Sequence, residues 1–198
     1  MRGFIRIVDG FNRGIGRLMM YGIFVIMGIL LWSSYSKVFA TPSLWTLEMA
    51  QFAMVAYYIL GGPYSIQLGS NVRMDLLYSE WSLRKKAWWD AFTIFFLIFY
   101  LGVLLWGGLS SLAYSLGHFS GGFRGFYGEV ISGFFTGGPA GAAEPMGVIE
   151  HSPTAWRPIV WPVKLTMCVG IFLMLLQCVS EFFKDVLRLR GEDMGEKA

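Results

Sequence analysis

The chain has 198 residues, of which 55% are hydrophobic and only 15% are charged. Soluble domains carry roughly 25% charged residues, and a soluble fold of this size could not bury the apolar stretches found here. Stretches without Asp, Glu, Lys or Arg cover 18–36, 49–72, 91–123 and 165–180. About 20 apolar helical residues cross a bilayer, so the sequence predicts an all-α integral membrane protein, with residues 1–198 forming a single membrane domain.

The segment before the first span predicts an amphipathic helix lying in the membrane interface. Apolar residues recur there at helical spacing, and arginines lie between them. These arginines are Arg2, Arg6, Arg13 and Arg17. A simple anchor for the first span and a sensor of the membrane surface are both compatible with this pattern.

Four transmembrane helices are expected, over about 18–36, 42–68, 89–112 and 158–183. The first block is too long for the core of a cleavable signal, and no small-residue cleavage site follows it before Lys37. We therefore expect it to be retained.

The second span has recognisable helix signals. Thr41 and Pro42 suit a helix start. Gly61, Gly62 and Pro63 follow within the span, and predict a kink or a break because proline removes a backbone donor.

The basic residues predict the orientation. Four Lys or Arg lie in each of three segments, 1–17, 71–90 and 181–198, which makes 12 of the 16 in the chain. Basic residues favour the cytoplasmic side. Both termini and the loop at 71–88 are therefore expected to be cytoplasmic, and the long loop at 116–157 periplasmic.

The long loop has 42 residues, among them 10 glycines and many aromatic residues. Loops of this length are usually functional or disordered, and the aromatic content argues against full disorder. An interfacial or re-entrant segment is expected around 123–135. The loop either meets a partner protein or packs on its own helices.

Few residues point to chemistry within the membrane. No span contains a histidine that could ligate a haem, and no span has an ionisable residue near its centre. We predict no catalytic, cofactor-binding or metal-binding residues, no cofactor, and no nucleic-acid partner. Glu48, near the outer end of the second span, either binds a cation or proton or forms an ion pair with Lys37 or a partner subunit.

Four short motifs carry a resemblance to a known family. They are Tyr35-Ser36-Lys37-Val38-Phe39, Trp45-Thr46-Leu47-Glu48, Leu60-Gly61-Gly62 and Asn71-Val72-Arg73-Met74-Asp75-Leu76-Leu77. With the four predicted spans, their order resembles the small membrane (Q, DctQ-type) subunit of tripartite ATP-independent periplasmic (TRAP) transporters.

The resemblance implies a function and partners. The small subunit would be a non-catalytic scaffold, paired with the large membrane (M) subunit in the bacterial inner membrane and surrounded by membrane lipids. The large subunit would carry out sodium-coupled uptake of an organic acid, which a periplasmic substrate-binding protein delivers. The residues implied as structural or subunit-interface candidates are Lys37, Trp45, Glu48, Gly61, Gly62, Asn71, Arg73 and Asp75.

The long outer loop departs from the common family form, in which this connection is short. Its end is similar to the longer branch labelled for mannitol and chloroaromatic compounds. We expect it to help dock the periplasmic binding protein, with Arg124, Glu150, His151 and Trp156 as candidate contacts. The alternative to a scaffold is a self-sufficient homodimeric four-helix transporter that uses Glu48 as its coupling carboxylate.

Overall fold

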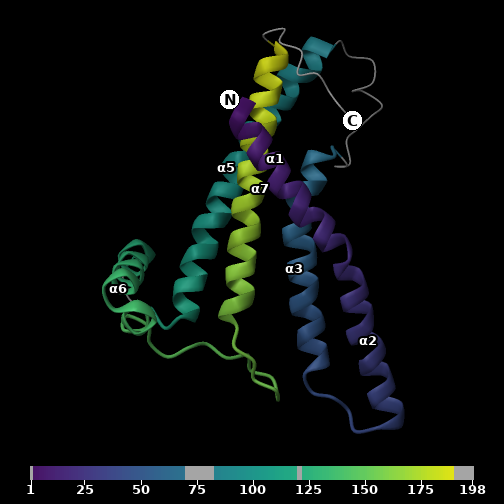
Figure 1. The fold of residues 1–198 in the computed structure, drawn as a ribbon, viewed down its shortest axis with the longest axis vertical. Helices are drawn as coiled ribbons and strands as arrows, with labels where there is room; N and C mark the ends of the chain where they lie inside the picture. The colour runs from purple at the N-terminus through teal and green to yellow at the C-terminus, as the bar shows by residue number, and fades with distance from the viewer. Residues whose placement is uncertain (1, 70–82, 120–121, 190–198) are drawn as a thin grey trace. The chain divides into compact units, whose positions relative to one another are not determined.

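The computed structural model describes residues 2–69, 83–119 and 122–189. Within these residues the chain is helical, and an isolated bridge between His151 and Ile159 is the only β pairing. The helices are α1 (Arg2–Met20), α2 (Gly22–Phe39), α3 (Thr46–Gln67), α5 (Leu83–Ser115), α6 (Phe123–Ala143) and α7 (Trp161–Leu189) (Figure 1). The predicted all-α class is confirmed.

Three helical stretches among the described residues are long and apolar enough to cross a membrane. They are Arg2–Phe39, Phe92–Ser115 and Trp161–Leu187. The 22-residue helix α3 is not among them, although it has sufficient length. Polar residues such as Glu48, Gln51 and Gln67 lower its apolar character, so the second span stays a prediction.

The boundaries of α3 correct two expectations. The helix begins at Thr46 rather than at Thr41. The chain before it is held in a non-helical turn, in which the Ser43 hydroxyl lies 3.1 Å from the Ser36 hydroxyl and 3.0 Å from that of Thr46. Of the kink or break expected at Gly61-Gly62-Pro63, the break is absent, because α3 continues through Pro63 to Gln67.

The chain divides into two compact units. The first consists of Met1–Ile23, Tyr57–Val103 and Val169–Ala198, and the second of Phe24–Ala56 and Leu104–Cys168. The first unit contains α1 and parts of α3, α5 and α7. The second contains most of α2, the start of α3, the end of α5, α6 with its flanking loops, and the start of α7.

Glycines allow the helices of the first unit to approach closely. A Cβ at Gly170 of α7 would lie 2.1 Å from Cγ2 of Ile59 and 3.0 Å from its carbonyl oxygen, on α3. A Cβ at Gly16 of α1 would lie 2.3 Å from Cβ of Tyr64. Small residues at such crossings are a common means of packing helices in membranes.

The second unit has its own apolar core, to which α5, α6 and α7 contribute. Its buried members are Leu112, Ala113, Leu116, Phe126 and Cys168. The Tyr127 hydroxyl on α6 donates a 2.9 Å hydrogen bond to the Leu109 carbonyl on α5. Burial, and to a lesser extent the neighbouring Cys168, raises the pKa of Tyr127 to about 12, so the phenol keeps its proton at a pH where an exposed tyrosine would lose it.

Helix α6 is longer than the expected segment at 123–135, and it bends sharply. Gly138 has φ 65° and ψ −152°, and Pro139 follows it. Beyond the bend the helix lies against its own earlier part, because a Cβ at Gly133 would come within 2.3 Å of the Gly141 carbonyl oxygen. Figure 1 shows the resulting two stretches of α6 side by side.

Candidate functional site: a polar network between the first and last helices

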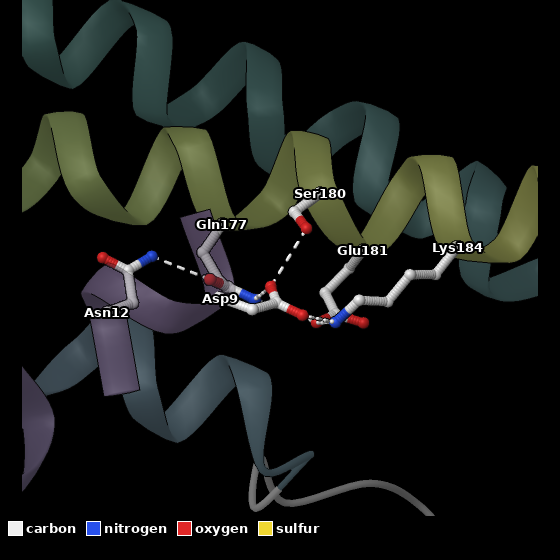
Figure 2. Close-up of polar contacts among 6 residues, drawn as sticks. All are labelled: Asp9, Asn12, Gln177, Ser180, Glu181 and Lys184. Atoms are coloured by element: carbon white, nitrogen blue, oxygen red, sulfur yellow. Dashed lines mark hydrogen bonds and ion pairs between the residues drawn. The ribbon is translucent and has the colours of Figure 1, made fainter. Parts of the chain in front are cut away.

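A polar cluster in the first unit joins α1 to α7 (Figure 2). Its centre is the Lys184 ammonium, which lies 2.6 Å from Oδ2 of Asp9 and 2.7 Å from Oε1 of Glu181. All three side chains are less than one fifth exposed. One ammonium faces two carboxylates, so these three groups carry a net charge of −1 when all are ionised.

Two buried side chains of α7 complete the network. The Gln177 amide donates to Asp9 and to Glu181 at 3.0 Å each, and its carbonyl oxygen accepts a 2.7 Å bond from the Asn12 amide. The Ser180 hydroxyl donates to Oδ1 of Asp9 at 3.1 Å. Gln177 and Ser180 are fully buried, and removing their partners would leave costly unpaired polar groups.

Helical spacing places these groups together. Gln177, Ser180, Glu181 and Lys184 are three or four residues apart, and such residues are neighbours on one face of a helix. Asp9 and Asn12 are spaced in the same way on α1. The network fixes the two helices against each other, and its donors and acceptors are satisfied mainly within the protein.

The sequence did not predict this network, because Lys184 was used only to infer orientation and Asp9 was assigned no role. A signal was present in the sequence. Asn12 interrupts the apolar pattern of α1, and Gln177 lies within the long uncharged stretch of α7. Polar residues at positions that pack against other helices usually have a polar partner there.

Glu48 is buried near the start of α3, with 5% of its surface exposed. One of its carboxylate oxygens lies 3.4 Å from the Ser152 hydroxyl in the outer loop. The other, Oε2, has no hydrogen-bond partner among the described residues. Lys37 is exposed, and within the described residues no ion pair joins it to Glu48, so this expected pairing is not found.

A different lysine, Lys164, holds the end of the outer loop in place. Its ammonium lies 2.6 Å from the carboxylate of Glu150 and donates to the Ser111 carbonyl at 3.3 Å. The backbone of Glu150 also donates to Ser115 and accepts from Val160. Glu150, which was predicted to dock the partner, therefore helps to hold the loop against α5 and α7.

The other predicted residues are not gathered into one site. Arg124 lies over the ring of Trp106, 4.7 Å from its centroid. His151 and Trp156 are exposed, as is Trp45 at the α3 entrance. Gly61 faces open space, whereas a Cβ at Gly62 would lie 2.8 Å from the Met174 sulfur. Asn71, Arg73 and Asp75 lie outside the described residues.

Metal binding finds no support in the described part of the chain. No group of three or more His, Cys, Asp or Glu side chains is arranged there to hold an ion. The α1–α7 network contains two carboxylates, but the Lys184 ammonium occupies the position between them.

One comparison with known proteins identifies a family. Residues 26–123, about half of the chain, match the model described as "Tripartite ATP-independent periplasmic transporters, DctQ component". The matched segment contains Lys37, Glu48 and the Gly61-Gly62 pair, whereas α1, α7 and most of the outer loop lie outside it. The chain matches no curated protein and no solved structure.

Proposed function

The chain belongs to the DctQ family of tripartite ATP-independent periplasmic transporters, and we propose that it is the non-catalytic scaffold of such a transporter. It would pair with the large membrane subunit, which carries out sodium-coupled uptake of an organic acid. A periplasmic binding protein would deliver that acid. The four spans, the bacterial inner membrane and the cytoplasmic position of both termini are parts of the same proposal.

The observation that carries the proposal is the position of the ionisable side chains. The stretch Phe92–Ser115 contains no Asp, Glu, Lys, Arg or His, and neither does α7 between Lys164 and Glu181. Glu48 and Lys37 lie toward the ends of α3 and α2. Transporters that move ions or anionic substrates usually need ionisable or unwound positions at mid-membrane, and a scaffold does not.

The surface of the helices also supports a role as a subunit. Large apolar side chains are exposed on the helices, including Phe24, Leu31 and Trp32 on α2 and Phe95 and Phe99 on α5. Lipid and the large subunit would cover these side chains. The α1–α7 network adds the internal rigidity that a scaffold needs, without leaving its carboxylates open to a substrate.

Reconstitution into liposomes tests the proposal. The chain alone, the large subunit alone and the two together are compared for sodium-driven uptake in the presence of the binding protein. Uptake is expected only when both membrane subunits are present. Uptake by the isolated chain would overturn the proposal.

A second candidate is a self-sufficient homodimeric transporter, and the unpartnered buried oxygen of Glu48 is the observation that favours it. A coupling carboxylate must be able to bind and release a cation or a proton. Glu48→Gln would then abolish uptake by the isolated chain. For the scaffold, we expect Glu48→Gln to retain at least half of the uptake by the complete transporter.

A further inference from the structure

Helix α1 presents three distinct faces. Ile5, Val8, Asn12 and Gly16 are buried against the protein. Because the helix has 3.6 residues per turn, the remaining residues form two further faces. One is exposed and apolar, and the other is exposed and basic. The exposed apolar side chains are Phe4, Ile7, Phe11 and Leu18, and the exposed arginines are Arg2, Arg6, Arg13 and Arg17. The four arginines fall within an arc of about 60°.

A groove of about 430 Å³ lies between the end of α1 and the second half of α3. Such a volume falls within the range of roughly 300–1,000 Å³ typical of ligand pockets. The wall from α1 is formed by Gly16, Met19 and Met20, and the wall from α3 includes three tyrosines and the Gly61-Gly62 pair. The lining is mainly apolar, and a Cβ at Gly61 would meet open space.

The basic face of α1 borders this groove. Arg13 precedes Gly16 by three residues, and Arg17 precedes Met20 by three residues, so each arginine is a surface neighbour of a residue that lines the groove. Arg13 and Arg17 are also neighbours of each other, four residues apart. The acidic residue of α1, Asp9, is engaged by Lys184 on α7 and does not neutralise them.

We propose that this groove binds an anionic phospholipid, with one acyl chain between α1 and α3 and the phosphate against Arg13 and Arg17. The mainly apolar walls suit an acyl chain better than a free phosphate ion. The two guanidinium groups at the rim select a negative head group over a zwitterionic one. Tyr57, Tyr58 and Tyr64 are amphipathic side chains of the kind enriched at the membrane–water interface.

The purified full chain in detergent tests this site by native mass spectrometry. Phosphatidylglycerol and phosphatidylcholine of the same acyl composition are titrated separately. We expect one phosphatidylglycerol per chain to bind on the order of tenfold more tightly than phosphatidylcholine. The double variant Arg13→Gln/Arg17→Gln should lose this preference, and equal binding of the two lipids by the wild-type chain would overturn the proposal.

A variant that fills the groove and two matched controls distinguish a defined site from a general electrostatic attraction. Gly61→Leu fills the groove and should weaken phosphatidylglycerol binding by roughly tenfold, whereas Gly102→Leu, whose Cβ also meets open space in α5, should not. Arg2→Gln/Arg6→Gln removes the same charge from the distant part of α1 and should change binding less than twofold. An effect of Arg2→Gln/Arg6→Gln equal to that of the Arg13 and Arg17 pair would mean a diffuse electrostatic attraction and overturn the site.

Photo-crosslinking gives a result that does not depend on the folding of a variant. A phosphatidylglycerol with a diazirine in its acyl chain is added to the wild-type protein. We expect label in the peptides that contain Met19, Met20 and 57–68. Label spread evenly over all membrane helices would contradict a defined groove.

Discussion

The Lys184 ammonium contacts the Asp9 carboxylate at 2.6 Å, although the two residues belong to the first and last helices of the chain. Asp9 accepts two further hydrogen bonds from α7, from Gln177 and Ser180. A single side chain of α1 therefore satisfies three donors on α7. Asp9 is therefore a main point of attachment of α1 to α7.

Replacing Asp9 with Asn should destabilise the protein by about 1–3 kcal/mol, because it leaves the Lys184 ammonium with one carboxylate and weakens two buried hydrogen bonds. Thermal unfolding of the detergent-solubilised chain measures the change. Glu129→Gln, on an exposed position of α6, is the matched control and should be neutral. In a double-mutant cycle, Lys184→Met should cost less in the Asp9→Asn background than alone, and strict additivity would contradict the pairing.

Gly170→Ala should also destabilise the protein, by about 1–3 kcal/mol, because the new methyl group meets Ile59 and its backbone carbonyl at the crossing of α3 and α7. Gly102→Ala is the control, since nothing lies within 4 Å of that Cβ. Alanine favours a helix over glycine, so the control should be neutral or slightly stabilising. The same unfolding measurement compares them, and equal effects of the two variants would rule out a close crossing.

Tyr127 gives a prediction about pH. Its pKa is raised from 10.0 to about 12 in the folded protein, chiefly by burial. The folded state therefore holds the proton more tightly than the unfolded state. The stability that this preference contributes is complete below pH 10 and is lost as the pH rises from about 10 to about 12.

The phenolate absorbance checks this behaviour. The chain has nine tyrosines, so the titration of Tyr127→Phe is subtracted from that of the wild type. The difference should have a midpoint near pH 12, and a midpoint near 10 would show that Tyr127 is not buried. The variant also loses the hydrogen bond to Leu109, which should cost about 1 kcal/mol.

The docking role of the outer loop is best tested by point substitutions. Removing 121–147 would also remove Phe126, a buried member of the core of the second unit. His151→Ala/Trp156→Ala alters exposed side chains, and we expect it to lower uptake severalfold when the binding protein is limiting. Phe119→Ala, which also alters an exposed side chain, is the control. Normal uptake by the His151 and Trp156 variant at every binding-protein concentration would show that these residues do not dock the partner.

Much of the local structure could be predicted from the sequence. The arginine and apolar spacing before residue 20 predicted the helix α1, and the uncharged stretches predicted the long helices α5 and α7. These patterns repeat with the period of a helix, so they can be read without knowing the fold. The predicted start of α3 was wrong by several residues, because Ser43 hydrogen-bonds to both Ser36 and Thr46 and holds the preceding turn.

The tertiary contacts could not be predicted in the same way. An ion pair with Lys37 was one of the alternatives for Glu48, but its carboxylate lies beside Ser152 of the distant outer loop. Asp9 and Gln177 are likewise far apart in sequence, and a repeating pattern of residues does not predict their contact. The bend at Gly138 was missed although Gly137-Gly138-Pro139 is a strong breaker signal, because the expected interfacial segment ended near 135 and the residues after it were read as a loop.

The network at Asp9 also has a consequence for synthesis. A chain is made from its N-terminus, so α1 exists before any of α7 has been translated. Asp9 and Asn12 then lack the groups to which they bond in the finished protein. The first helix to be made therefore reaches its neighbours on α7 only near the end of synthesis, and ribosome-bound chains that end before Val169 should leave α1 more accessible to added protease than the finished protein does.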